Sequence, residues 1–340
     1  MHVGVIAPLY RKIPPTGHAG VERIIDQLAN GLLERGHKVT LFAASGSKFK
    51  GNLVTTWPRE IRDISESLRG IVHADHLLKI FSRDRGIELW SNHFDNVALS
   101  FAPLLKAPMA STIHNGWNKE REVFFRDASK YTHLIAISKQ QRTLYRGAKF
   151  TKTIYNGVDT DRHAFGKGGG GYFLWLGWIS EKKGAGDAVQ IARKAKVPLV
   201  IAGMIAKENR GYFETKIRPY LSKQIRYVGE VSLTEKVRLL RSAVGLLSPL
   251  RWEEPFGLVA VEAMSCGTPV LTTPRGAMPE LVVHGKTGFL AKTPAGLTKY
   301  VRRIGELDRR TARQHAIEHF SLRRMVDEYE RTYLGLLANA

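Results

Sequence analysis

The chain has 340 residues, 43% of them hydrophobic, which excludes a disordered protein and favours two globular domains over one. Lysine and arginine total 52 against 31 aspartate and glutamate residues, so the formal net charge is +21, and the excess is distributed over both halves. A single cysteine excludes an internal disulfide. No apolar run is long enough to span a bilayer, and the first residues do not resemble a secretory leader. We therefore expect a cytoplasmic protein.

The first half of the chain alternates short apolar runs with amphipathic stretches, beginning with a buried strand at 3–8 and a helix at 21–35. This alternation is typical of a mostly parallel sheet whose strands are connected by helices. Further strands of this half are predicted at 39–44, 88–92, 109–114, 134–138 and 153–156. Residues 45–58 have no readable pattern.

A glycine-rich run at 166–171 interrupts the alternation, and such a run predicts a flexible join rather than a helix or a strand. The alternation then resumes, and from 295 onward the pattern is helical. Strands are predicted at 172–177, 199–203, 226–229, 245–249 and 270–273, and helices at 185–196, 213–221, 235–243 and 256–266.

These patterns predict an α/β protein with two doubly wound, Rossmann-like domains, at residues 1–165 and 166–320. A C-terminal helix at 321–340 is expected to pack back toward the first domain. Doubly wound sheets bind ligands at the carboxyl ends of their strands, so a cleft between two such domains is the expected site.

Two carboxylates, Glu254 and Glu262, lie eight positions apart around a predicted helix start at Pro255. Backbone N–H groups at a helix start have no intrahelical partner and bind phosphate oxygens, while a neighbouring carboxylate can bind hydroxyl groups. The arrangement favours a ligand that carries both phosphate and hydroxyl groups, such as a nucleotide sugar. The alternative for Glu254 is a charge that favours the helix dipole, and for Glu262 an exposed or hinge-facing side chain.

Three further features lie where strands are predicted to end. A glycine-containing loop at 14–20 allows the backbone to approach a phosphate, although a plain turn is the alternative. Lys183 follows the first strand of the second domain and can reach phosphate oxygens, or it belongs to a solvated charge run. His114 ends the strand at 109–114, where this fold places ligand contacts, although a lone histidine there is more often structural.

Basic residues are most crowded in the C-terminal helical region. Such a surface attracts an anionic lipid, nucleic acid or a phosphorylated acceptor, and the alternative is a solvated face that aids solubility. No recognised nucleic-acid-binding motif accompanies the charge, so specific nucleic-acid binding is not expected. The residues concerned are Arg302, Arg303, Arg309, Arg310, Arg313, Arg323 and Arg324.

Taken together, these motifs resemble the retaining glycosyltransferases of family 4, which have the GT-B fold, over nearly the whole chain from Val3 to about Leu290. The most specific match is the Glu-x7-Glu motif formed by Glu254 and Glu262. The other matching segments follow in the family's order and are Gly20–Arg23, Gly36–Thr40, Asn156–Asp159, Gly267–Val270 and Pro279–Leu290.

The resemblance implies roles for residues of the second domain. Glu254 is expected to bind hydroxyls of the donor sugar, and Glu262 the ribose hydroxyls of the nucleotide. Lys183 is expected to neutralise the leaving diphosphate, and the backbone near Val231 to contact the base. The backbone N–H groups expected to face the diphosphate are those of Phe256, Gly257 and Leu258.

In the first domain, the resemblance implies that His114 contacts the donor sugar and that Gly20 allows the domain to close on the diphosphate. The implied reaction transfers a hexose, glucose or mannose, from UDP-glucose or GDP-mannose with retention of configuration. It needs no metal and no cofactor besides the donor. The acceptor is not identified, but the basic charge favours an anionic acceptor or an anionic membrane surface, with the protein peripheral at the inner membrane face.

The sequence departs from the family pattern at Trp178, five residues before Lys183, where an arginine usually shares the diphosphate charge. We expect Lys182 or Arg251 to compensate. The first-domain loop reads His18-Ala19-Gly20 where the family more often has two adjacent glycines, and the segment 275–277 replaces a more usual Gly-Gly pair. A non-catalytic or degenerate nucleotide-sugar-binding protein is therefore the alternative function.

Overall fold

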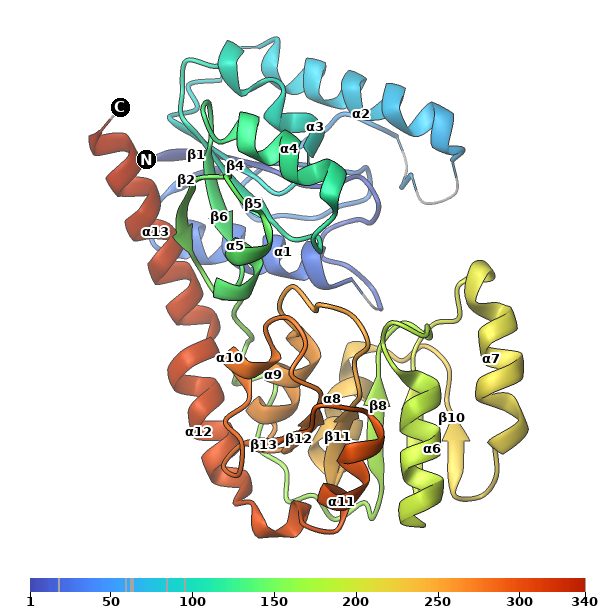
Figure 1. Ribbon diagram of the computed structural model, residues 1–340. Coiled ribbons are helices and arrows are strands. Elements are labelled where there is room, and N and C mark those ends of the chain that lie inside the picture. Colours follow the sequence, from blue (N-terminus) through green and yellow to red (C-terminus); the bar gives the residue numbers. More distant parts are fainter. Residues whose placement is uncertain (18, 59, 62–63, 84, 95, 340) are drawn as a thin grey trace. The chain divides into compact units, whose positions relative to one another are not determined.

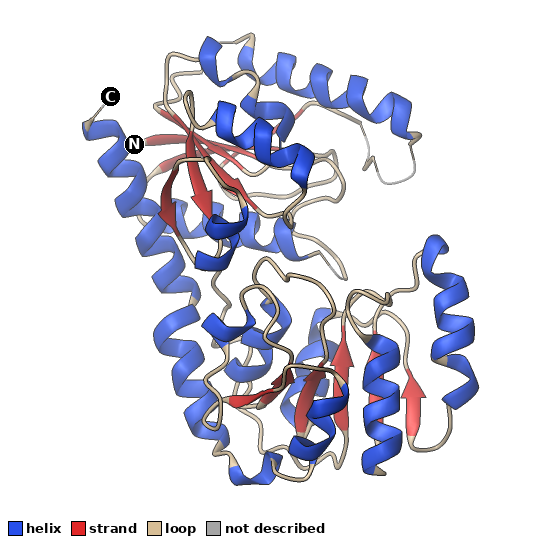
Figure 2. Cartoon of the chain, in the orientation of Figure 1, coloured by secondary structure: helices blue, strands red, loops and turns tan. Residues whose placement is uncertain are grey.

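A computed structural model describes residues 1–17, 19–58, 60–61, 64–83, 85–94 and 96–339 of the protein. His18, within the predicted glycine loop, lies outside the described residues. The chain divides into two compact units: Met1–Gly157 together with Arg323–Ala340, and Val158–Leu322 (Figure 1). Each unit contains one sheet with helices on both of its faces (Figure 2).

The first unit is built on a seven-stranded sheet in the order β3-β2-β1-β4-β5-β6-β7, and every neighbouring pair is parallel. The strands are β1 (His2–Ile6), β2 (Lys38–Ala43), β3 (Asn52–Thr55), β4 (Leu89–Asn92), β5 (Met109–Ile113), β6 (His133–Ala136) and β7 (Phe150–Thr153). The helices are α1 (Gly20–Glu34), α2 (Glu66–Phe81), α3 (Asn96–Leu99), α4 (Lys119–Ala128), α5 (Lys139–Leu144) and α13 (Leu322–Ala338), with a 3-10 turn η1 (Ala102–Leu104).

The second unit has a six-stranded parallel sheet in the order β10-β9-β8-β11-β12-β13. Its strands are β8 (Phe173–Leu176), β9 (Leu199–Ala202), β10 (Ile225–Tyr227), β11 (Gly245–Ser248), β12 (Val270–Thr272) and β13 (Gly288–Leu290). Its helices are α6 (Ala185–Ala195), α7 (Arg210–Lys216), α8 (Leu233–Ser242), α9 (Leu258–Ser265), α10 (Met278–Leu281), α11 (Thr298–Val301) and α12 (Arg309–Phe320). Short 3-10 turns are η2 (Lys207–Asn209), η3 (Arg218–Tyr220), η4 (Ala295–Leu297) and η5 (Ile304–Glu306).

The predicted pair of doubly wound, Rossmann-like sheets is confirmed, because both strand orders reverse beside the first strand of their unit. Strands β1 and β9 are buried along their whole length, so their sequences read as largely apolar runs. Helix α1 shows why the helical periodicity was readable, since its buried residues recur every three or four positions and face the sheet.

The structural division falls after Gly157, earlier than the boundary at 165 that the glycine run suggested. The run itself lies within the second unit. The N–H groups of Gly166, Gly168 and Gly170 donate to the carbonyls of Cys266, Arg241 and Ser242 at 2.9–3.1 Å, so this backbone is held along the second unit rather than forming a free join. A run of glycines was read as flexible because the sequence does not show these partners.

Some of the C-terminal arginines have structural partners, whereas Arg302, Arg310 and Arg323 are exposed. Arg309 donates to the carbonyls of Gly166 at 2.9 Å and Ala243 at 2.9 Å, and Arg313 donates to those of His163 and Ser265. These guanidinium groups supply hydrogen-bond donors to backbone carbonyls. Arg303 and Arg324 form ion pairs along their own helical segments. In this region, the predicted attraction of an anionic partner stays a prediction that rests on Arg302, Arg310 and Arg323.

Candidate functional site

In doubly wound sheets the ligand-binding crevice lies at the carboxyl ends of the two strands where the order reverses. In the second unit these strands are β8 and β11, which are paired with each other. The loops that leave them, residues 177–184 and 249–257, contain Lys183 and Glu254. The sheet topology therefore brings together two residues that the sequence placed 71 positions apart.

Close approach of these two loops depends on a glycine. Gly184 has a φ of +72°, and a Cβ added there would lie 1.9 Å from the carbonyl oxygen of Pro249. The Arg251 N–H donates to the carbonyl of Lys182 at 2.9 Å and ties the loops together. This position requires glycine both for its backbone conformation and for the space.

Lys183 and Glu254 form a direct ion pair, with Nζ 2.5 Å from Oε2. Trp252 supports the pair in two ways: its Nε1–H donates to the same carboxylate oxygen at 3.0 Å, and the lysine ammonium lies 4.6 Å from the centre of its ring. The carboxylate is 12% exposed and the lysine 30%. Because both groups remain partly exposed, a ligand with hydroxyl and phosphate oxygens can contact them together.

The backbone of Glu254 is held by the segment 275–277, where the sequence departs from the Gly-Gly pair of the family. The Ala277 N–H donates to the Glu254 carbonyl at 2.9 Å. Gly276 has a φ of +58°, and a Cβ there would meet the Glu254 carbonyl oxygen at 2.1 Å. The single position that needs glycine therefore has it, whereas Ala277 has an ordinary φ of −73°. The loss of a second glycine leaves this contact intact.

Helix α9 begins at Leu258, two residues later than predicted, and Gly257 is its N-cap with a φ of +105°. The predicted role of Pro255 as the first helical residue is therefore wrong. The Phe256 side chain is buried, with its ring 6.1 Å from that of Phe320, so only its backbone is offered to a ligand. The free N–H groups of the first turn of α9 start near Glu254, as an anion site requires.

Glu262 lies just over one turn inside α9 and is only 4% exposed, so the alternative of an exposed side chain is wrong. Its carboxylate pairs with Lys236 of α8, and the His163 ring nitrogen Nε2 lies 3.7 Å away. Burial lowers the pKa of His163, so the lysine supplies the positive charge near neutral pH. Sequence reasoning missed Lys236, although it predicted a helix at 235–243. Ser232, which caps the start of α8, was the local signal for that helix.

Trp178 follows β8 and its side chain is 41% exposed. Of the two cations expected to compensate for it, Arg251 is already engaged, with two nitrogens 2.5 and 2.7 Å from the carboxylate of Asp187. That pairing raises the pKa of Arg251. Lys182 has an exposed side chain with no side-chain partner among the described residues. Lys182 is therefore the cation of this loop that a diphosphate can recruit.

Replacing Lys182 by alanine is expected to weaken nucleotide-sugar binding by about fivefold, or roughly 1 kcal/mol, as for an exposed charge pair. Replacing Trp178 by arginine is expected to strengthen it by a similar factor. Calorimetric titration with a nucleotide-diphosphate sugar measures both changes. The matched control is Lys194→Ala, an exposed lysine in the last turn of α6. Unchanged affinity in Lys182→Ala removes Lys182 from the site.

The remaining predicted contact of this unit is Val231, which is half-buried and immediately precedes Ser232, the N-cap of α8. The same helix carries Lys236, the partner of Glu262. The order of residues along α8 therefore places the segment expected to meet the base one turn before the buried carboxylate pair.

In the first unit, the strand order reverses between β1 and β4. Gly20 is the first residue of α1, the helix that follows β1, and Ala19 is its N-cap. His93 and His114 follow β4 and β5, two paired strands, and their rings stack at 5.2 Å with His93 Nδ1 2.9 Å from His114 Nε2. His114 is therefore not a lone histidine, because His93 at the end of the neighbouring strand is its direct partner.

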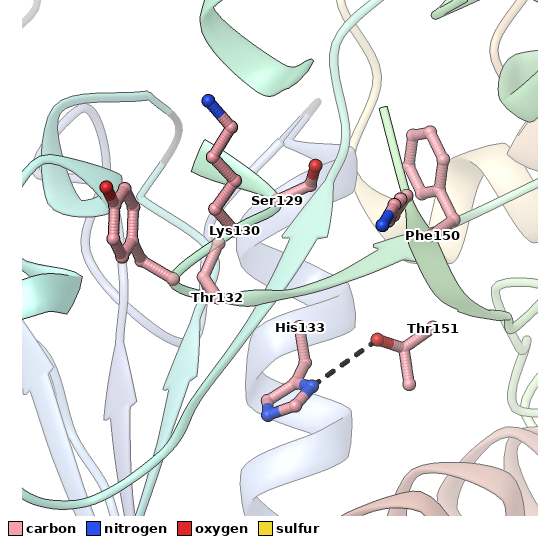
Figure 3. Close-up of a pocket in the computed structure, with 8 residues that line it drawn as sticks. Ser129, Lys130, Thr132, His133, Phe150 and Thr151 are labelled. Carbon is pink, nitrogen blue, oxygen red and sulfur yellow. Dashed lines mark hydrogen bonds between the residues drawn. The ribbon is translucent and has the colours of Figure 1, made fainter. Parts of the chain in front are cut away.

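A separate polar cavity of about 270 Å³ lies in the first unit (Figure 3). It is formed where β6 and β7 begin. Within it, Nδ1 of His133 is hydrogen-bonded to Oγ1 of Thr151 at 3.5 Å. This is the amino end of the strands, opposite to the edge that carries His114. Its lining residues are Ser129, Lys130, Tyr131, Thr132, His133, Lys149, Phe150 and Thr151.

Within the described ranges, no group of three or more histidine, cysteine, aspartate or glutamate side chains is arranged to hold a metal ion. Among the same residues, no helix combines the length and apolar character that crossing a bilayer requires.

Two family profiles match consecutive parts of the chain: "Glycosyltransferase Family 4" matches residues 18–162 and "Glycosyl transferases group 1" matches residues 158–319. The chain belongs to the group 1, family 4 glycosyltransferases. Solved structures agree on the fold. The sucrose-phosphate synthase from Thermosynechococcus elongatus has a TM-score of 0.83 at 17% identity over 100% of both chains. Anabaena HepE in complex with UDP-glucose has a TM-score of 0.78 at 17% identity, covering 98% of this chain and 100% of that one.

Curated relatives of this glycosyltransferase include the glycogen synthase of Mycobacterium tuberculosis, 27% identical over 273 residues. That match covers 70% of this chain and 66% of the relative, just under two thirds of its length. An uncharacterized glycosyltransferase of Methanocaldococcus jannaschii is 29% identical over 75% of both chains. Spore coat protein SA of Bacillus subtilis is 23% identical over 95% of this chain and 94% of its own length.

Proposed function

We propose that the protein is a glycosyltransferase that transfers a hexose, glucose or mannose, from a nucleotide-diphosphate sugar to an unidentified acceptor. The observation that carries the proposal is the pairing of both carboxylates of the Glu-x7-Glu motif with lysines in the second unit. Each of its carboxylates is paired with a lysine, Lys183 for Glu254 and Lys236 for Glu262, beside the start of α9. This combination offers acceptors for hydroxyl groups and donors for phosphate around the segment from Glu254 to Glu262.

In the proposed reaction, Glu254 binds hydroxyls of the sugar, and Glu262 binds the ribose. Breaking the bond between the sugar and the diphosphate leaves positive charge on the sugar and negative charge on the leaving group. Lys183 and the N–H groups at the start of α9 stabilise that negative charge because they are held in place before the reaction begins. For the first unit, we propose that His114 binds a sugar hydroxyl and that Gly20 lets the backbone approach the diphosphate.

We further propose that the transfer retains the anomeric configuration and needs no metal, with UDP-glucose or GDP-mannose as donor. The UDP-glucose complex of Anabaena HepE, which shares this fold, supports testing uridine donors first. A cytoplasmic location stays a prediction. An anionic acceptor or an anionic membrane surface stays a prediction that rests on the net charge of +21.

The second candidate is a degenerate binder that holds the nucleotide sugar without turning it over. The exposed Trp178 in place of a cation favours it, because one positive group fewer stabilises the leaving diphosphate. Under this alternative the donor binds at the same residues and only the chemical step is lost.

The test is donor turnover across a panel of UDP-, GDP- and ADP-linked hexoses, with EDTA present and no acceptor. We expect slow release of the nucleotide diphosphate from one donor, and the anomeric configuration of the released sugar reports the stereochemistry. Tight binding of a donor without release from any of them supports the degenerate binder instead. Release that stops in EDTA and returns with a divalent cation contradicts the metal-independent mechanism.

A further inference from the structure

A buried hydrogen-bond chain in the first unit connects the C-terminal helix α13 to His114. The Tyr333 hydroxyl lies 2.6 Å from Ser91 Oγ, and Ser91 Oγ lies 3.0 Å from His93 Nε2. His93 Nδ1 then lies 2.9 Å from Nε2 of His114. Tyr333 and Ser91 are fully buried and His93 is 2% exposed, so His114 is the member of the chain that is open to a ligand.

Both imidazole rings are neutral near pH 7. Burial lowers the pKa of His93 well below its ordinary value, and it lowers the pKa of His114 to about 4. A neutral imidazole has one N–H and one bare nitrogen, so each ring donates at one nitrogen and accepts at the other. The direction of the chain is therefore decided by where the hydroxyl protons of Ser91 and Tyr333 can go.

Neither Ser91 nor Tyr333 has another side-chain hydrogen-bond partner in the part of the chain that the structure describes. Suppose first that Nε2–H of His93 donates to the Ser91 hydroxyl. The Ser91 and Tyr333 hydroxyls then have only the hydrogen bond between them, in which one of the two donates and the other accepts. The proton of the accepting hydroxyl is buried and has no acceptor. Leaving a buried donor without an acceptor destabilises the folded protein. If Tyr333 donates to Ser91 and Ser91 donates to Nε2 of His93, every proton in the chain has an acceptor.

With Nε2 of His93 bare, the proton of that ring is on Nδ1 and is donated to Nε2 of His114. The proton of His114 is then on its own Nδ1, the nitrogen that has no partner among the described residues. We propose that this chain fixes His114 as the Nδ1–H tautomer, so that it presents a hydrogen-bond donor to an oxygen of the ligand. Tyr333, Ser91 and His93 are positioning residues for this donor. The ligand oxygen is a sugar hydroxyl under the proposed function, but the tautomer itself does not depend on that function.

The test uses the full-length protein with ¹⁵N-labelled histidine and long-range ¹H–¹⁵N NMR at pH 7, which reports the protonated nitrogen of each ring. The signals of His114 are assigned by their loss in His114→Gln. We expect His114 protonated at Nδ1 and His93 protonated at Nδ1. Protonation of His114 at Nε2 in the parent protein overturns the proposal, whatever the variants do.

Three variants and a control separate positioning from general packing. Ser91→Ala and His93→Leu each remove the preference for the Nδ1–H tautomer, so His114 is expected to show signal from the Nε2–H form. In His93→Asn, the amide N–H takes the place of Nδ1–H, and the Nδ1–H form of His114 is expected to persist. The control is Tyr329→Phe, which removes another hydroxyl of α13, one bonded to Thr112 at 2.9 Å, and should leave the tautomer unchanged. A tautomer that is unaffected by both Ser91→Ala and His93→Leu contradicts the proposal.

Where a donor is turned over, His93→Leu is expected to lower kcat about fivefold to tenfold, the effect of one misdirected hydrogen bond, and His93→Asn to restore it. The tautomer measured by NMR does not depend on this kinetic measurement. If His114 is the Nδ1–H tautomer but the protein turns over no donor, the proposed hydrogen-bond chain is confirmed and only the proposed function is contradicted.

Discussion

Replacing Glu254 by glutamine is expected to lower donor turnover by about a hundredfold or more, the loss seen when a preorganised polar group of an active site is removed. The glutamine keeps the size of the side chain but removes the charge that holds Lys183 Nζ 2.5 Å from the carboxylate. Both the sugar contact and the position of the lysine are therefore lost together. Steady-state release of the nucleotide diphosphate measures the effect.

Two further variants sharpen this prediction. Glu208→Gln, at an exposed carboxylate in η2, is the control for loss of one negative charge in the same unit and should keep parental turnover. Lys183→Met combined with Glu254→Gln should lose little more than either single variant, because residues that act as one unit are not additive. Parental turnover in folded Glu254→Gln would remove Glu254 from the reaction.

Breaking the buried pair between Glu262 and Lys236 is expected to have the largest effect on stability. The carboxylate is 6% exposed and the lysine 12%, so removing either partner leaves an uncompensated charge in a site with little water. The expected cost is about 3 kcal/mol for Glu262→Gln or Lys236→Met, near the lower end of the range for buried pairs. In a unit of this size the melting temperature falls by about 10 °C.

The double variant separates stability from ligand binding. Glu262→Gln with Lys236→Met removes both charges, so most of the lost stability is expected to return. The affinity for the nucleotide sugar is not expected to return, because the ribose contact is still missing. Scanning calorimetry and titration calorimetry on the same four proteins give both quantities. A melting temperature that is unchanged in Lys236→Met contradicts a coupled pair.

Sequence patterns were sufficient for the central strands, since strands buried on both faces give unbroken apolar runs such as Leu199–Ala202. They also located helices α1, α6, α8 and α9, but gave no bounds for α2 to α5. They were insufficient at the edges of the sheets. Strand β3 (Asn52–Thr55) and strand β13 (Gly288–Leu290) were not predicted, because short edge strands lack a distinct pattern, and β3 is also partly exposed. Strand β7 was predicted at 153–156 and lies at Phe150–Thr153 for the same reason.

The candidate site was predictable where a motif is continuous in sequence and unpredictable where partners come from other elements. The Glu-x7-Glu segment named both carboxylates, but the ion pair of Glu262 with Lys236 joins α9 to α8 across 26 positions. The hydrogen bond between His93 and His114 likewise depends on the pairing of β4 with β5. Sheet order and helix packing decide such contacts, and the local periodicity of the sequence predicts neither of them.

The central claim is that the second unit binds a nucleotide diphosphate at the start of α9, beside the strands β8 and β11. The most direct measurement is the change in backbone amide NMR signals of the ¹⁵N-labelled protein as UDP is added. The account predicts that the largest changes occur in residues 177–184 and 256–262 and near Val231. Changes confined to the polar cavity where β6 and β7 begin, or no change at a saturating concentration of UDP, would contradict it.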